Sequence, residues 1–403
     1  MTGRHLRKPG VMLAAAAAIL MISLGARQSF GLFLAPMCGA LGWGRGTFSL
    51  AIALQNLVWG LAQPFAGMVA DRYGAGRVLA VGGACYAAGL ALMARSVTSV
   101  DLDLSAGLLI GLGLSATSFG VVLGVVGRSV APERRSAALG IAGAGGSFGQ
   151  FIMLPYAQFL ISDFGWYNAL LLFAASALLI VPLGAALAGG STATETRSQS
   201  IGTALRETAA HRGFWLLTGS FLVCGFQTVF IMVHLPSYIV DRGGPAVQGM
   251  TALAVIGFFN IVGTFAAGFL GDVFRKKYLL SAIYGIRVIA ITAFIMLPVT
   301  MASIIAFAAV MGLTWLGTVP LTNALIAQIF GVQYLSTLFG IAFLGHQVGG
   351  FLGAWSGGYA FDVAGSYAPV WTIAIAASVV AGLACLPIDE RPIGAPFATK
   401  TIT

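Results

Sequence analysis

Two copies of one short stretch decide the fold of this chain. The first reads GMVADRYGAGR at Gly67–Arg77, and the second reads GFLGDVFRKKY at Gly268–Tyr278. Each copy follows a long apolar run, places Gly four residues before Asp, and continues with Arg or Lys. Gly67 and Gly268 are 201 residues apart in a chain of 403 residues. A loop that recurs at half the chain length predicts a duplicated fold with two similar halves.

Composition predicts that these halves lie in a membrane. The chain is 58% hydrophobic and 8% charged, with a mean hydropathy of +0.94, whereas soluble domains carry roughly 25% charged residues. Apolar runs of about 20 residues, long enough to cross a bilayer, recur from end to end. We therefore predict an all-α membrane protein with twelve transmembrane helices in two pseudo-symmetric six-helix bundles. The predicted spans are 11–36, 48–70, 78–95, 104–126, 137–160, 167–188, 214–239, 250–270, 279–298, 303–328, 337–360 and 370–387.

The basic residues predict an orientation and a division of the chain. Sixteen Lys and Arg residues fall on one side of the predicted spans and three on the other. Cytoplasmic loops carry such an excess, so both termini are expected in the cytoplasm, with the chain in a bacterial inner membrane. We expect an N-terminal bundle at 1–188, a cytoplasmic linker at 189–212, a C-terminal bundle at 213–390 and a cytoplasmic tail at 391–403. The linker is expected to contain a short amphipathic helix from Ile201 to Ala210, and the residues after Asp389 are expected to be disordered.

Two predicted spans are rich in glycine, which allows helices to approach closely. One set lies in the fifth span and the other in the eleventh. We expect these positions to serve helix contact and not chemistry. They are Gly140, Gly143, Gly146 and Gly149, and Gly349, Gly350, Gly353 and Gly357.

Six plus six spans, a central polar linker and the GxxxDRxGxxR loop together resemble the major facilitator superfamily. The core Asp71–Arg72–Tyr73–Gly74 fits the pattern well, whereas the second copy departs from it after Asp272. The resemblance implies a secondary transporter whose halves rock in alternating access. It also implies gating roles for Gly67, Asp71, Arg72, Gly268 and Asp272, in packing or pairing one half against the other. Anchoring to lipid headgroups is the alternative for the basic residues.

Two spans of the second half resemble a narrower branch, that of the monocarboxylate porters and oxalate–formate antiporters. The stretches are FIMVHLPSYIVDRGG, which contains His234, and FFNIVGTFAAGFLGD, which contains Asn260. The branch implies substrate-site roles for both residues. Four residues after the Asn the branch normally has a substrate-binding Arg, and here the position is Thr264. His346 stands where the oxalate–formate antiporters carry a Lys.

The charge inside the predicted spans favours an anionic substrate. Only Arg27 and Arg287 lie there, and all twelve acids fall in loops, linker or tail. An intramembrane charge costs at least about 2.5 kcal/mol, and a bound carboxylate would supply the missing countercharge. We predict Arg287 as the principal ligand, with Tyr284 beside it; the alternative is a structural Arg bonded to backbone carbonyls of a neighbouring span. Arg27 either lines the cavity or reaches the outer headgroups.

Symmetry and the neutral polar residues extend this prediction. The position fifteen residues after Asp71 is Tyr86, so the duplication places an aromatic residue opposite Arg287. His346 and His234 are candidate proton carriers, with a structural role as the alternative. Asn260 and Asn56 are candidates to orient a carboxylate, with helix–helix hydrogen bonding as the alternative.

We therefore predict a secondary active transporter of a small organic anion, a carboxylate, coupled to a proton or to a counter-anion. A transporter that exports neutral or amphipathic molecules with the same fold is the alternative. No catalytic constellation, metal cluster or phosphate loop is found, so neither an enzyme nor a metal or other cofactor is expected. The expected partners are the substrate, its coupling ion and the lipid bilayer, with no nucleic acid, and the chain is expected to be a monomer.

Overall fold

The computed structural model describes residues 9–129, 132–187, 201–331 and 334–393. These residues are helical, with no strand among them. The elements of the N-terminal half are α1 (Pro9–Gln28), α2 (Phe30–Leu41), α3 (Arg45–Tyr73), α4 (Ala75–Ala94), α5 (Ser99–Leu102), the π-helical η2 (Asp103–Leu109), α6 (Ile110–Thr117), α7 (Phe119–Ser129), α8 (Pro132–Leu178) and α9 (Ile180–Ala186). Those that follow are α10 (Ile201–Ala210), α11 (Arg212–Asp241), α12 (Ala246–Val273), α13 (Lys276–Met296), α14 (Met301–Thr314), α15 (Thr318–Phe330), α16 (Leu335–Ala364) and α17 (Ala368–Cys385).

These elements make twelve membrane crossings. Ten described segments are long and apolar enough to cross a bilayer. One of them, Ile141–Ala186, has 46 residues and turns at Gly165, where φ is 75°, so it counts as two crossings. The twelfth is α3, whose 29 residues are less apolar because they include Gln55, Asn56 and Gln63. The predicted twelve-helix membrane fold is confirmed.

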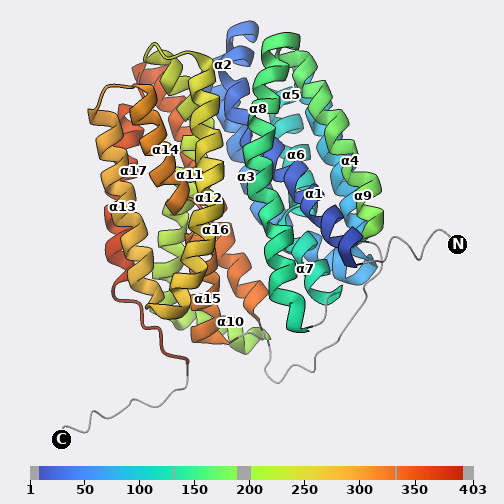
Figure 1. Cartoon of the computed structure of the whole chain (residues 1–403), viewed down its shortest axis with the longest axis vertical. Helices are drawn as coiled ribbons and strands as arrows, with labels where there is room; N and C mark the ends of the chain where they lie inside the picture. Colours follow the sequence, from blue (N-terminus) through green and yellow to red (C-terminus); the bar gives the residue numbers. More distant parts are fainter. Residues whose placement is uncertain (1–8, 130–131, 188–200, 332–333, 394–403) are drawn as a thin grey trace, which may run out of the picture.

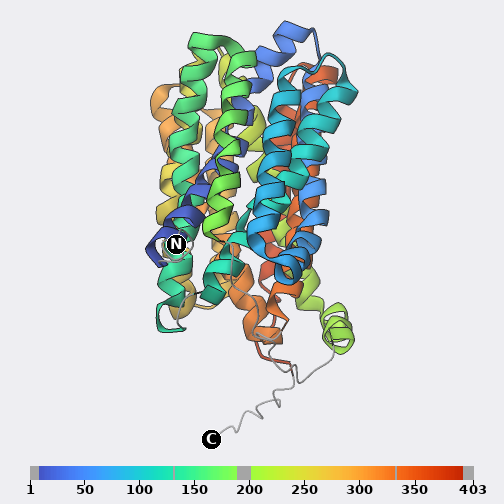
Figure 2. The ribbon, with the colours of Figure 1, turned by 90° about the vertical axis from the view of Figure 1, so that its right-hand side faces the viewer.

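The crossings gather in two groups (Figure 1). Elements α1 to α9 lie on one side and α11 to α17 on the other. The groups touch where α3 packs along α16, α8 along α12 and α2 against α11. In Figure 1, α1 begins and α17 ends at the lower end, here called the terminal end. The predicted short helix is present as α10 (Ile201–Ala210) and lies at the terminal end, where it packs against α11 (Figures 1 and 2).

The signature loop makes a very short connection. Gly74 alone joins α3 to α4, with φ at 93°, a backbone conformation that costs Gly little and other residues more. In the second copy Phe274 and Arg275 join α12 to α13 with negative φ angles of −111° and −64°. The second loop therefore turns without a glycine, which explains why its sequence departs from the first.

Four crossings are interrupted among the described residues, one of them at Leu179 between α8 and α9. The other three breaks lie at Ser29, at Ser118 and at the stretch 315–317. Next to each, a hydroxyl donates to a carbonyl one turn earlier: Ser29 Oγ to Gly25 O (3.1 Å), Thr117 Oγ1 to Gly113 O (2.8 Å) and Thr314 Oγ1 to Val310 O (3.1 Å). Such bonds compete with the helical ladder. A break leaves carbonyl groups that another part of the protein has to satisfy, because the bilayer cannot.

Glycines bring equivalent helices into contact in the two halves. A Cβ atom at Gly145 or Gly149 would meet the backbone of α1, and one at Gly349 or Gly353 would meet the backbone of α11. Close packing of α8 on α1 and of α16 on α11 therefore needs glycine. The predicted contact role is confirmed at Gly149, Gly349 and Gly353, whereas Gly145 was not predicted and Gly143 faces open space. The surroundings of Gly140 lie outside the described residues.

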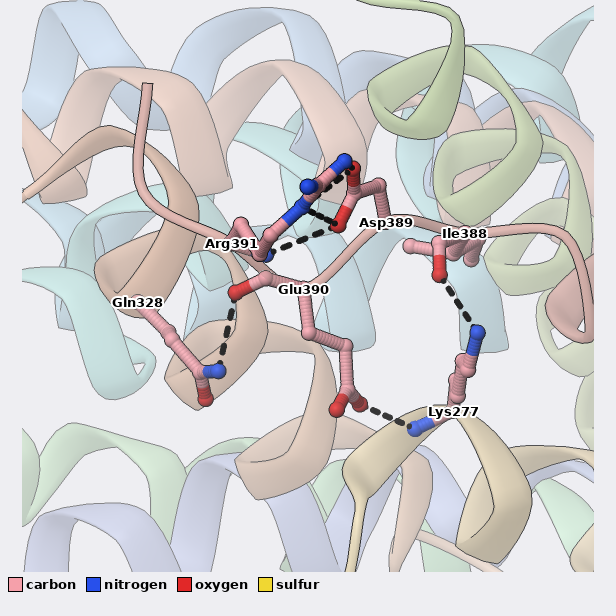
Figure 3. A network of polar contacts seen from close by, with 6 residues as sticks. All are labelled: Lys277, Gln328, Ile388, Asp389, Glu390 and Arg391. Atoms are coloured by element: carbon pink, nitrogen blue, oxygen red, sulfur yellow. Dashed lines mark hydrogen bonds and ion pairs between the residues drawn. The ribbon is translucent and has the colours of Figure 1, made fainter. Parts of the chain in front are cut away.

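The segment after α17 is docked on the C-terminal half (Figure 3). Glu390 Oε1 accepts from the backbone N–H of Lys277 (2.8 Å), in the first turn of α13, and its carbonyl accepts from Gln328 Nε2 (2.9 Å). Lys277 Nζ donates to Ile388 O (2.9 Å), and Ile393 N–H donates to Ile329 O (2.9 Å). The prediction of disorder after Asp389 was wrong for Glu390 to Ile393, because a carboxylate there caps the positive end of α13. Residues 394–403 lie outside the described part.

Candidate substrate site

Arg287 lies inside the C-terminal half and is fully buried. Its Nη2 donates to the carbonyls of Thr314 and of Trp315, the latter at 2.7 Å, and its Nη1 donates to Gln227 Oε1 at 3.1 Å. Its Nε has no partner, and its guanidinium lies 5.6 Å from the ring centroid of Tyr284. The alternative stated for this residue, bonding to carbonyls of a neighbouring span, is the arrangement observed.

The break in the tenth crossing explains why this cation needs no acid. Thr314 ends α14, so its carbonyl lies at the negative end of a helix dipole. A cation there is favoured, and it supplies donors that the missing next turn would have supplied. The countercharge of Arg287 is thus provided by the backbone.

Arg27 occupies a different setting, between the two halves. It lies in α1, and its Nη2 donates to Asn56 Oδ1 in α3 at 2.5 Å. Its Nη1 lies 3.5 Å from the sulfur of Met232 in α11, and its guanidinium lies 5.0 Å from the ring centroid of Trp59. Its Nε has no partner, and the residue retains 7% exposure.

None of these three neighbours of Arg27 (Asn56, Met232 and Trp59) carries a negative charge. An amide oxygen, a thioether sulfur and an indole face are all weak acceptors for a cation. Among the described residues its guanidinium donates to no helix-end carbonyl, in contrast to Arg287, although Arg27 itself lies in the last turn of α1. Arg27 is therefore the span cation whose charge is least compensated, and the one that a bound anion would stabilise most.

His346 is connected to the surroundings of Arg27 by a series of ring contacts. Trp59 contacts Phe343 edge-on, with centroids 5.5 Å apart, and Phe343 stacks on His346 at 5.9 Å. His346 Nδ1 lies 3.2 Å from Gln347 Oε1, while His346 Nε2 and Gln347 Nε2 have no partner. Both residues lie in α16, so this cluster joins α1 and α3 of one half to α16 of the other. Arg27 and Asn56 are thus brought into direct contact, and His346 is linked to them through Trp59 and Phe343.

His234 and Asn260 are not part of this cluster. His234 Nε2 lies 2.8 Å from the carbonyl of Ala354 and Nδ1 lies 3.3 Å from the hydroxyl of Tyr367, so both ring nitrogens have partners. Asn260 Oδ1 accepts from the N–H of Leu316 (3.2 Å), beside the break of the tenth crossing. Its Nδ2 donates to Ser147 Oγ in the other half (3.3 Å). Both arrangements fit the helix-bonding alternative.

Trp59 was not predicted from the sequence, although the duplication contained a signal for it. Trp59 precedes Gly67 by the same number of residues as Asn260 precedes Gly268. Trp59 Nε1 donates to Ser118 Oγ at 3.0 Å, beside the break of the fourth crossing. Trp59 and Asn260 thus brace equivalent breaks in the two halves. Phe343 and Gln347 gave no sequence signal that separates them from ordinary packing residues.

The predicted pairing of Tyr86 with Arg287 across the symmetry was wrong. Tyr86 donates to the carbonyl of Ser23 at 2.8 Å, and Tyr284 donates to the carbonyl of Ser220. The two tyrosines make the same contact, one in each half. Tyr284 is therefore the counterpart of Tyr86, because the spacing between equivalent residues is slightly shorter inside the spans than at the loops.

A polar latch joins the halves at the end opposite the termini. Arg45, which begins α3, binds Asp241 at the end of α11 through two bonds of 2.6 and 2.7 Å, and donates to the hydroxyl of Tyr367 at 2.7 Å. Asp362 of α16 accepts from the backbone N–H of Arg45 at 2.8 Å and of Gly46 at 2.7 Å. A carboxylate of one half therefore caps the first turn of a helix in the other half, where the N-cap residue Gly44 offers no side chain.

The predicted gating residues at the terminal end make no such contact in the described part. Positions Gly67 and Gly268 both face open space. Asp272 is exposed, and the exposed Arg72 has its guanidinium 5.4 Å from the ring centroid of the adjacent Tyr73. The side chain of Asp71 lies outside the described residues. Their gating role stays a prediction that concerns another state of the molecule.

The sequence pattern of the Major Facilitator Superfamily matches residues 13–354. The chain belongs to this superfamily, and it is a multi-pass membrane transporter and not an enzyme.

Its relatives and its structural neighbours agree. The chain is 27% identical over 357 residues to monocarboxylate transporter 13 of Rattus norvegicus, covering 87% of this chain and 82% of the relative. It is 26% identical over 366 residues to the uncharacterized MFS-type transporter YcxA of Bacillus subtilis (strain 168), covering 87% of each. The fold matches the crystal structure of a bacterial homologue of the human lysosomal transporter Spinster, in an inward-facing and unoccupied conformation. That match has a TM-score of 0.75 and 14% identity, and it covers 94% of each chain.

Proposed function

We propose that this transporter carries a small organic anion, a monocarboxylate, and holds the carboxylate on Arg27 between the two halves. The names of its relatives support a monocarboxylate as substrate, although the relatives are distant. The single observation that carries the proposal is the setting of Arg27. It is a cation between the halves with an unused donor and only neutral neighbours.

The position of Arg27 suits alternating access. A carboxylate that accepts from the guanidinium replaces weak acceptors with a charge-assisted bond. Because Arg27, Asn56 and Met232 belong to helices of both halves, the bound anion contributes to contacts that change when the halves rock. The latch closes the end opposite the termini, so with the predicted orientation the site opens toward the cytoplasm. His346, with its unpartnered Nε2, is our candidate for a coupled proton; anion exchange is the alternative mechanism.

The test is uptake into proteoliposomes that contain the purified protein. Labelled pyruvate, lactate and phenylacetate are offered with and without an inward proton gradient. We expect saturable uptake that falls at least about thirtyfold in Arg27→Gln, the loss typical when one partner of a buried charge pair is removed. Stimulation by the proton gradient identifies symport, and stimulation by internal carboxylate identifies exchange.

Arg95→Gln is the matched control, since Arg95 is an exposed Arg at the end of α4 and lies outside the signature loop. It is expected to transport as the unmodified protein does. Normal carboxylate uptake by Arg27→Gln would refute the proposed site. Uptake of neutral or amphipathic compounds, with no carboxylate carried, would refute the proposed substrate class.

A further inference from the structure

The surroundings of Arg27 also limit how many negative charges the substrate can carry. Among the described residues, every acid lies in a loop or near a helix end, and the polar groups closest to Arg27 are neutral. One guanidinium can neutralise one carboxylate. A dianion would bring a second charge into the membrane interior without a partner, at a cost of several kcal/mol. The site therefore fits a monoanion.

Aromatic rings form a continuous surface from Arg27 toward the terminal end. We call it the aromatic wall, and it consists of Trp59, Phe339, Phe343 and His346. Phe339, Phe343 and His346 are spaced by four and three residues, so they lie on one face of α16. The centroids of Phe339 and Phe343 are 6.3 Å apart, and those of Phe343 and His346 are 5.9 Å apart in nearly parallel planes. Trp59 of α3 joins the wall edge-on.

The aromatic wall is not completely covered by other parts of the protein. Phe339 and Phe343 are only half-buried, so part of each ring is not covered by protein. His346 is more than nine-tenths buried beside Phe221 and the Cys224 thiol, and its Nε2 has no hydrogen-bond partner within bonding distance. A polar atom buried among rings without a bond is costly, unless a ligand satisfies it in another step of the cycle. Both features suit a ligand that has an apolar, planar part.

We infer that the preferred substrate is a monocarboxylate with an aromatic ring, its carboxylate on Arg27 and its ring against Trp59 and Phe343. This inference rests on the proposed function and adds the class of side group. The carboxylate and the ring meet the two kinds of surface that lie side by side here. A small acid such as acetate would use the guanidinium and leave the wall uncovered.

Pairs of acids that differ by one phenyl group test the inference. The full-length protein in detergent is titrated with acetate and phenylacetate, and with pyruvate and phenylpyruvate, and ligand affinity is obtained from the shift in melting temperature. We expect the phenyl compound of each pair to bind at least about tenfold more tightly, from apolar burial and ring contact together. Cyclohexylacetate separates the two causes, because it has the apolar area without the aromatic face.

Phe343→Leu assigns the preference to the wall, since it keeps an apolar side chain and removes the ring. We expect the phenyl preference to fall about three- to tenfold, with the affinity for pyruvate unchanged. Phe159→Leu is the control, since Phe159 is exposed and stacks edge-on with Phe164 far along α8. Equal affinities within each pair, or an unchanged preference in Phe343→Leu, would overturn the inference and leave the proposed function standing. If none of these acids binds, the proposed function fails and the inference fails with it.

Discussion

The two arginines inside the membrane differ in what surrounds them, and this difference assigns their roles. Arg287 binds the carbonyls at the end of α14, and Arg27 binds an amide, a thioether and an indole face. Hydropathy and charge counts treat both residues alike. The two residues are distinguished by their hydrogen bonds: Arg287 donates to carbonyls at the break in the tenth crossing, whereas Arg27, beside the break at Ser29, donates to Asn56.

Asn56→Asp tests the charge state of Arg27 with almost no change of shape. The new carboxylate would lie at the position from which Asn56 Oδ1 now accepts a bond from Arg27. It would act as an internal countercharge and compete with the substrate. We expect the affinity for any carboxylate to fall at least about tenfold. This is less than the loss of about 2–5 kcal/mol that follows when one partner of a buried charge pair is removed. Asn56→Ala, which removes the acceptor and adds no charge, is the control, and equal affinity in Asn56→Asp and Asn56→Ala would contradict this account.

Arg287→Ala is expected to affect stability first. It would leave the carbonyls of Thr314 and Trp315 and the amide of Gln227 without their donor, at roughly 1–3 kcal/mol for each group left unsatisfied. We expect a clearly lower melting temperature in detergent than for Arg27→Ala, with carboxylate binding retained in the folded fraction. A melting temperature equal to that of the unmodified protein would show that the carbonyls do not depend on Arg287.

At the scale of elements, the latch is a contact that exists in one conformation only. Asp362 of α16 caps α3 from the other half, and this cap is lost when the halves separate at that end. Losing an N-cap costs about 1 kcal/mol, so Asp362→Ala is expected to increase the population open at that end about fivefold. Double electron–electron resonance between spin labels at Val97→Cys and Leu297→Cys would detect it as a larger long-distance fraction. Asp163→Ala, an exposed acid at the same end, is expected to leave the distances unchanged.

The docked segment after α17 provides a second element-scale prediction. Glu390 caps α13 from the far end of the chain, so Glu390→Ala is expected to cost about 1 kcal/mol of stability. Asp389 binds the exposed Arg391 (Figure 3), and this contact lowers the pKa of Asp389 to about 2. Exposed pairs stabilise little, so Asp389→Ala is the matched control and is expected to leave thermal unfolding unchanged. An equal effect of the two substitutions would contradict the capping role of Glu390.

At the scale of the whole molecule, the sequence predicted the structural features that depend on the combined properties of many residues. Twelve apolar runs, a repeat at half the chain and the glycines at helix contacts are properties of many residues. The structure confirms the twelve crossings and the contact role of Gly149, Gly349 and Gly353. The breaks at Ser29, Ser118 and Trp315 arise from local hydroxyl bonds and close packing, which hydropathy does not record. The carbonyl partners of Arg287 depend on one of these breaks, and the contact of Arg27 with Met232 depends on how the two halves meet. Neither could be predicted from the sequence.

The central claim is that the protein neutralises one buried cation itself and leaves the other for its substrate. The direct test is equilibrium binding of a labelled carboxylate, pyruvate or phenylpyruvate, to the purified full-length protein and to Arg27→Gln and Arg287→Gln. We predict that Arg27→Gln loses at least about thirtyfold in affinity, and that folded Arg287→Gln binds as the unmodified protein does. The reverse pattern, with binding lost in Arg287→Gln and kept in Arg27→Gln, would contradict the account and assign the anion to the C-terminal half.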